Sequence, residues 1–122
     1  MKKLILTVVS FLVMLPSIAG QYEDALRTGQ PVLLYLYSKD CSYCKTFNPM
    51  YEKLFQNHKN TYRFVKVDAN SPYGGLLVRD MMAGYVPFVV LADAKRHYLT
   101  VINPDCIVNN ACIEGEMKSF LK

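Results

Sequence analysis

The chain has 122 residues, which is enough for one domain but not for two. Its formal net charge is +4, part of which comes from two lysines beside the N-terminus, and no basic cluster follows them. We therefore expect no binding to nucleic acid.

The first 19 residues have the pattern of a cleaved signal peptide. Two lysines precede an apolar run from Leu4 to Leu15, and Ser17 and Ala19 supply small residues where a signal peptidase reads. We therefore expect cleavage after Ala19, with cleavage after Gly20 as the alternative. A membrane anchor is the alternative, but the run is shorter than the ~20 residues that span a bilayer. The mature domain is then residues 20–122, and we expect it in the periplasm or otherwise exported.

The mature sequence alternates helical and strand patterns. Tyr22 to Thr28 predicts a short helix, and the continuously apolar stretch from Pro31 to Tyr37 predicts a buried strand. A helix, a strand, a helix, a two-stranded hairpin and a last helix should follow, over residues 41–57, 62–68, 71–82, 88–92, 97–102 and 114–122. This order predicts an α/β fold: a mixed sheet of about four strands, with parallel strands joined by helices, a closing hairpin, and helices on both faces.

Several details of the helices can also be predicted. Pro49 removes one backbone hydrogen bond and should interrupt and bend the helix over 41–57. Ser71, which is followed by proline, is typical of an N-cap, whereas the Gly74-Gly75 pair should weaken the helix that follows. In the last helix, three apolar residues should face the core: Met117, Phe120 and Leu121.

Cys41-Ser-Tyr-Cys44 lies where the first predicted strand passes into a helix. Two thiols at this spacing can close a small disulfide ring. The sulfur of Cys41 would lie at the amide-rich, partly positive end of the helix, which favours the thiolate over the thiol. Because the thiolate is the species that attacks disulfides, the pattern predicts a redox site.

These features together resemble the thioredoxin fold over residues 21–122. A C-x-x-C pair opens a helix after a buried strand, and Pro49 matches the kink proline of that helix in thioredoxins. Val86-Pro87, which opens a later strand, matches the family's cis-proline. The resemblance therefore implies a thioredoxin-like fold for the whole mature sequence.

The resemblance also implies a role for each matching residue. Cys41 would be the exposed nucleophile and Cys44 the partly buried resolving thiol. Val86 and Pro87 would bind substrate beside the disulfide, because a cis-proline turns the backbone so that the preceding residue can pair with an extended substrate segment. Three residues near Pro87 are candidates for the border of a substrate groove: Met81, Met82 and Tyr85. Core packing explains the two methionines equally well.

The chain departs from thioredoxins around the redox pair. Ser42 and Tyr43 replace the usual Gly-Pro and are expected to tune the redox potential; a tyrosine here resembles glutaredoxins and bacterial disulfide isomerases. Asp40 replaces a tryptophan and would, if close, disfavour the thiolate. Tyr35 stands where thioredoxins have a buried acid that relays a proton for the second thiol. A phenol with a pKa near about 10 is a poor base at neutral pH, so the proton acceptor for Cys44 is left open.

Cys106 and Cys112 lie in a turn-rich segment before the last predicted helix. We expect a structural disulfide that closes a loop of about seven residues. One alternative is a second redox pair that relays electrons to or from Cys41 and Cys44. The other is a four-cysteine zinc site, which the loose spacing disfavours, and we expect no metal.

The sequence thus predicts an exported thiol–disulfide oxidoreductase that acts on cysteines of other exported proteins. We expect no metal or organic cofactor, a membrane or soluble redox partner that resets the pair, and a monomer. Reductase and oxidase stay equally open. An isomerase is disfavoured, because periplasmic isomerases add a dimerisation domain for which this chain has no room. The alternative is a non-catalytic thioredoxin-like binding module, in which Cys41–Cys44 is a stable structural disulfide.

Overall fold

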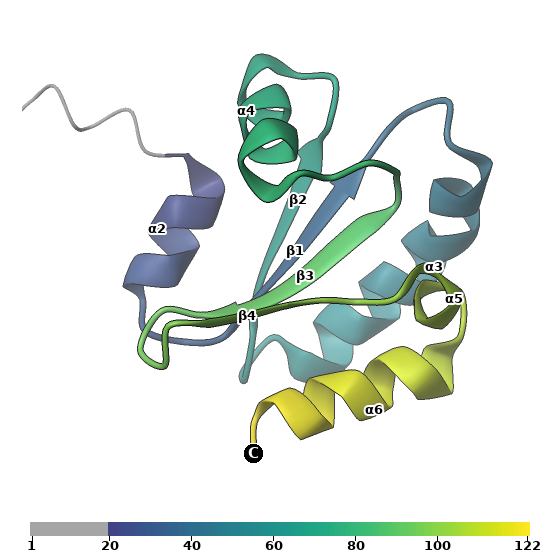
Figure 1. The fold of residues 1–122 in the computed structure, drawn as a ribbon. Coiled ribbons are helices and arrows are strands. Elements are labelled where there is room, and N and C mark those ends of the chain that lie inside the picture. The colour runs from purple at the N-terminus through teal and green to yellow at the C-terminus, as the bar shows by residue number, and fades with distance from the viewer. Residues whose placement is uncertain (1–19) are drawn as a thin grey trace, which may run out of the picture.

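The computed structural model describes residues 20–122, and the signal-peptide prediction for residues 1–19 lies outside this range. The described elements are, in chain order, α2 (Gln21–Arg27), β1 (Val32–Tyr37), α3 (Ser42–His58), β2 (Arg63–Asp68), α4 (Pro72–Met81), β3 (Phe88–Asp93), β4 (Tyr98–Val101), α5 (Pro104–Ile107) and α6 (Asn110–Phe120) (Figure 1). All the elements predicted for this range are present. The short helix α5, in the segment predicted to be turn-rich, is an addition to them.

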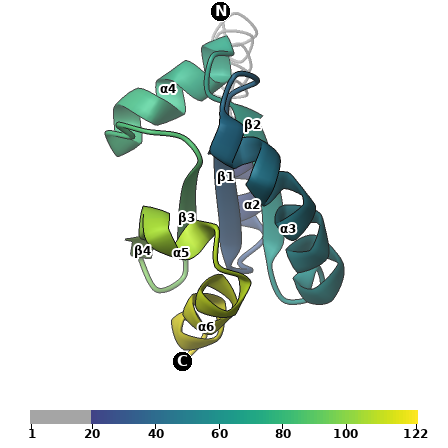
Figure 2. The ribbon, with the colours of Figure 1, turned by 90° about the vertical axis from the view of Figure 1, so that its right-hand side faces the viewer.

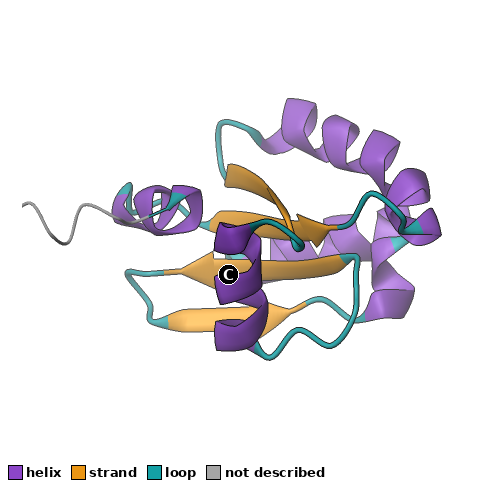
Figure 3. Cartoon of the chain, turned by 90° about the horizontal axis from the view of Figure 1, so that it is seen from above, coloured by secondary structure: helices purple, strands orange, loops and turns teal. Residues whose placement is uncertain are grey.

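Four strands form one mixed sheet in the order β2-β1-β3-β4, and Figure 3 shows them side by side. β1 pairs with β2 in parallel, whereas β1 with β3 and β3 with β4 are antiparallel. The predicted parallel arrangement therefore holds for β1 and β2 only. Because α4 lies at the end of the sheet where β2 ends, the chain enters β3 from that end and runs back against β1 (Figure 1).

Helices cover both faces of the sheet, as the sequence predicts. Figure 2 shows α3, α5 and α6 in front of the sheet and α2 behind it. Alternate residues of β1 point to opposite faces: Leu33 and Tyr35 pack with α3 and α6, whereas Leu34 and Leu36 pack with α2 and α4. Burial on both faces explains why β1 is a continuous apolar run rather than an alternating one.

Local signals set the start of α4 as predicted. The Ser71 hydroxyl accepts a hydrogen bond from the backbone N–H of Gly74 at 2.9 Å, and Pro72 occupies the first turn. The helix is continuous despite its two glycines. A Cβ atom on Gly74 would overlap the carbonyl oxygen of Asp68, so this glycine allows α4 to pack closely against the end of β2.

Two helix predictions are wrong in detail. α3 runs through Pro49 without interruption, because the proline costs one backbone bond while Phe47 and Leu54 on either side stay buried in the core. α6 begins four residues earlier than predicted, where the Asn109 side chain accepts from the backbone N–H of Cys112. Met117 and Phe120 are buried as predicted, whereas Leu121 follows the last residue of α6 and is 44% exposed.

Between residues 20 and 122, no helix has the length and apolar character that crossing a lipid bilayer requires.

Candidate redox site

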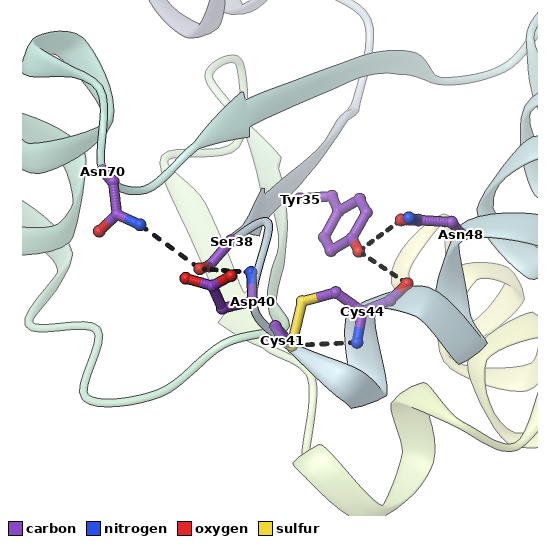
Figure 4. The surroundings of a disulfide bond; sticks show 7 residues. All are labelled: Tyr35, Ser38, Asp40, Cys41, Cys44, Asn48 and Asn70. Carbon is purple, nitrogen blue, oxygen red and sulfur yellow. Dashed lines mark hydrogen bonds between the residues drawn. A yellow bond between two sulfur atoms is a disulfide. The ribbon is translucent and has the colours of Figure 1, made fainter.

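Cys41 and Cys44 form a disulfide at the N-terminus of α3 (Figure 4). Cys41 has an extended backbone and is the N-cap, and its sulfur accepts a hydrogen bond from the backbone N–H of Cys44 at 3.0 Å. On reduction, a thiolate at residue 41 would keep this amide donor and the favourable end of the helix dipole. The strand-to-helix junction thus supplies the electrostatics that a nucleophilic sulfur needs.

The two cysteines are buried to different degrees. Cys44 is only 1% exposed and belongs to the core between the sheet and α3, whereas Cys41 is half-buried at its edge. The loop that leads to Cys41 turns through Ser38, whose hydroxyl accepts from the backbone N–H of Asp40. In Figure 4 the Asp40 side chain lies beside Ser38, on the other side of Cys41 from Tyr35. Because Cys44 is buried and Cys41 is only half-buried, an incoming sulfur reaches Cys41 more readily than Cys44.

The peptide bond between Val86 and Pro87 is cis, the form that the resemblance to thioredoxins implies. Pro87 is buried, and Val86 packs against the same core cluster as Cys41 and Cys44. Beside this segment lies a hollow of about 430 Å³, here called the groove, which is lined by Tyr43, Tyr85, Val86, Pro87, Pro104, Asp105 and Val108. The structure thus brings the predicted substrate-binding residues together with the redox pair.

Of the other residues considered from sequence, some lie at the groove and some do not. Tyr43, which is 66% exposed, and Tyr85 line it, whereas Ser42 is exposed but is not part of the lining. Met82 is 89% exposed, and Met81 packs against the core on the α2 and α4 side of the sheet. The two methionines are therefore not groove residues.

Cys106 and Cys112 form the second disulfide. It joins α5 to the first turn of α6, and Cys106 is buried close to Ile107 and Ile113 in the core. Because α5 carries Pro104 and Asp105, this bond holds one wall of the groove against the body of the domain.

The thioredoxin family model matches residues 14–97, which is more than half of the chain. The chain belongs to the thioredoxin family. Membership supports thiol–disulfide oxidoreductase activity in general and leaves its direction open. No curated protein matches the chain.

Solved structures with this fold have little sequence in common with the chain. Mitochondrial thioredoxin 3 from Saccharomyces cerevisiae, in its oxidised form, is 21% identical with a TM-score of 0.67, and the alignment covers 81% of this chain and 87% of that one. Thioredoxin from Trypanosoma brucei brucei is 17% identical with a TM-score of 0.70, over 83% of each chain. The J-Trx1 fragment of ERdj5 is 15% identical with a TM-score of 0.70 over 82% of this chain, which spans only 46% of that fragment. These likenesses show the fold alone.

Tyr35 is the main departure of this thioredoxin-family chain at its redox site. Its side chain is fully buried in the core cluster that also contains Cys44, and its hydroxyl donates to Asn48 Oδ1 at 2.7 Å and lies 3.4 Å from the Cys44 carbonyl oxygen (Figure 4). Burial, with a smaller contribution from Tyr37, raises the pKa of Tyr35 to about 12. The phenol therefore stays protonated at neutral pH and acts as a hydrogen-bond donor rather than as a base.

Asn48 and Lys66 both contact the Tyr35 side chain, and the sequence did not predict either of them as a residue of the site. Asn48 lies four residues after Cys44 on α3, a spacing that places both on the same side of the helix. Lys66 pairs with Tyr35 across the parallel strands, and its ammonium lies 5.7 Å from the centre of the Tyr35 ring and 4.9 Å from that of Tyr37. Helical spacing could have indicated Asn48, but Lys66 required the register of the sheet.

Replacing Tyr35 with phenylalanine should cost stability without changing how activity depends on pH. The variant loses the hydrogen bond to Asn48, so the free energy of unfolding should fall by about 1 kcal/mol. Because the pKa of Tyr35 lies near about 12, the rate of disulfide reduction between about pH 6 and 9 should keep the shape of its wild-type profile. Urea unfolding and a pH series of insulin reduction measure the two effects. A displaced pH profile would show that the phenol takes part in proton transfer.

Proposed function

We propose that the chain is an exported thiol–disulfide oxidoreductase that exchanges disulfides with cysteines of other exported proteins through its Cys41-Ser-Tyr-Cys44 pair. The observation that carries this proposal is the half-buried Cys41 at the N-terminus of α3, where its sulfur accepts a backbone N–H, with a groove nearby that Val86 and Pro87 help to line. A thiolate stabilised in this way is a good leaving group, and the groove offers a place for the chain that carries the partner cysteine.

In the reducing direction, the Cys41 thiolate attacks one sulfur of a substrate disulfide. A mixed disulfide forms, and the other substrate sulfur leaves as a thiolate. Cys44, once deprotonated, attacks the Cys41 sulfur, closes the Cys41–Cys44 disulfide and releases the second substrate thiol. Two electrons have then passed to the substrate, and oxidation of a substrate dithiol follows the same steps in reverse.

Val86 and Pro87 support binding of an extended substrate segment. Pro87 is buried and fixes the direction of the backbone before β3, while Val86 is only half-buried beside the redox pair. An extended segment alongside residue 86 can make main-chain hydrogen bonds, in the way that an added strand does at a sheet edge. Main-chain hydrogen bonds of this kind carry little preference for substrate sequence by themselves, so any preference comes from the side chains that line the groove.

Export is supported by the sequence pattern of residues 1–19 and by the two disulfides of the described domain. Outside the cytoplasm, substrate cysteines are available as disulfides or as unpaired thiols. The chemistry needs no cofactor, but a membrane or soluble partner must return the Cys41–Cys44 pair to its starting state.

A non-catalytic binding module is the second candidate. The observation that favours it is Tyr35, which stays protonated where thioredoxins have a buried acid and so offers no base to Cys44. In this case the Cys41–Cys44 disulfide would stay closed, and the groove would hold a peptide without exchanging sulfurs with it.

The reduction potential of Cys41–Cys44 separates the two candidates. We expect a value between about −270 and −120 mV, the range of thioredoxin-fold enzymes, and its position in that range also decides the direction. The protein is equilibrated in thiol–disulfide buffers, alkylated, and digested so that peptides carrying Cys41 and Cys106 are quantified separately. A potential well below about −300 mV would favour the structural disulfide of a binding module.

A further inference from the structure

The groove beside the redox pair has walls from three segments of the chain. Tyr43 comes from α3, Val86 and Pro87 from the segment before β3, and Pro104 and Asp105 from α5. Tyr43 lies between the two cysteines in sequence, and Val86 packs in the same cluster as Cys41. Neither cysteine lines the groove itself, but the groove adjoins the Cys41–Cys44 site through Tyr43 and Val86, so residues that flank a substrate cysteine can reach it.

The lining is apolar and aromatic except at one position. Of the groove residues in the described part of the chain, only Asp105 carries a charge. Its side chain is exposed, and between residues 20 and 122 its carboxylate has neither a hydrogen-bond donor nor an ion-pair partner. The carboxylate is thus free to pair with a group that enters the groove.

Asp105 is held by a fixed element of the fold. Its backbone N–H donates to Asn103 Oδ1 at 2.9 Å, and Cys106, which follows it, is bonded to Cys112. Ile107, two residues further on, is fully buried. The backbone around Asp105 is therefore anchored on both sides, which keeps the residue that carries the charge at the groove wall.

We propose that Asp105 is a specificity-determining residue, which makes the chain prefer substrates with a lysine or arginine beside the reacting cysteine. The proposal rests on the proposed function at the same site. A long basic side chain can lay its methylene groups along the apolar lining and place its cation against the carboxylate, whereas an acidic side chain is repelled. Three exposed charged residues near the cysteine pair lie outside the lining and do not reinforce the negative charge of Asp105: Lys39, Asp40 and Lys45.

The test uses three peptides that differ only in the residue next to a single cysteine, which is lysine, glutamine or glutamate. The cysteine of each is joined by a disulfide to thionitrobenzoate, so attack of the Cys41 thiolate on the peptide sulfur releases a coloured thiolate. With mildly reduced wild-type protein we expect the rate constants to fall in the order lysine, glutamine, glutamate, by about two- to fivefold between the first and last. The ratio should shrink when salt is raised to about 0.5 M, because exposed charges are then screened.

Variants show whether Asp105 causes the preference. Asp105→Asn should bring the lysine-to-glutamate ratio close to one, and Asp105→Lys should invert it. Glu116→Gln is the matched control, because it removes a negative charge from an exposed position on α6 outside the groove and should leave the wild-type ratio in place. An unchanged ratio in both Asp105 variants, or equal rates for all three peptides with wild type, would overturn the inference alone. If no peptide reacts faster than the spontaneous rate, the proposed function fails, and the inference fails with it.

Discussion

Replacing Cys41 with serine should lower the rate of insulin disulfide reduction at least about a hundredfold, to the level of the uncatalysed reaction. A serine hydroxyl is not ionised at neutral pH and cannot form a disulfide, so neither the attack nor the mixed disulfide is possible. The substitution is small and lies at a half-buried N-cap position, where serine is also a good cap for α3. The variant should therefore fold, and its loss of activity can be assigned to the missing sulfur.

Cys44→Ser is the matched control for this experiment, because it removes the other sulfur and leaves the nucleophile. Cys41 should still attack a substrate disulfide, but nothing then resolves the mixed disulfide. The variant should accumulate covalently joined to substrate, which mass spectrometry under non-reducing conditions detects. Cys41→Ser should form no such adduct at residue 44, because Cys44 is buried. If both variants reduced insulin at the wild-type rate, the catalytic assignment would be wrong.

The parts of the fold that the sequence could predict are those decided by local patterns. The run from Val32 to Leu36 is apolar throughout because helices cover both of its faces, and such a run is recognisable without a structure. Ser71 followed by proline marks the start of α4 through one side-chain hydrogen bond within the first turn. The position of the Cys41–Cys44 disulfide at the start of α3 was predictable for a related reason, since Cys41 is itself the N-cap of the helix that it opens.

The features of the fold and of the site that the sequence could not predict depend on packing between distant segments. The direction of β3 follows from where α4 ends relative to the sheet. Leu121 fits the apolar pattern of the last helix, but the helix ends one residue before it and the side chain is exposed. Lys66 lies over Tyr35 only because β1 and β2 pair in one particular register.

The groove wall formed by α5 is the clearest example of a feature that depends on packing and not on a local sequence pattern. The segment 103–109 is rich in residues typical of turns, and its pattern predicts no helix. It forms a short one because Asn103 caps it through the backbone N–H of Asp105, and because Ile107 and Cys106 are buried in the core. Asp105 consequently could not be assigned to the groove from sequence, although the disulfide that anchors it could be predicted.

Replacing Cys106 and Cys112 together with alanine should lower the free energy of unfolding by about 2 kcal/mol, because the unfolded chain no longer has a closed loop of about seven residues. For a domain of about 100 residues this corresponds to a fall in melting temperature of roughly 10 °C. Reductant provides an independent measurement. In a Cys41→Ser/Cys44→Ser background it acts on the Cys106–Cys112 bond alone, and it should lower the melting temperature by a similar amount.

The same alanine variant distinguishes a structural bond from a redox relay. If Cys106 and Cys112 anchor α5, the variant should still react once through Cys41, while its preference for lysine over glutamate peptides weakens because Asp105 is no longer held in place. If they relay electrons, the first turnover should be normal and resetting of the Cys41–Cys44 pair by a redox partner should fail. A melting temperature within about 2 °C of wild type would contradict the structural role. A disulfide stabilises the fold mainly by lowering the conformational entropy of the unfolded chain, so the loss of a structural disulfide should lower the melting temperature by more than this.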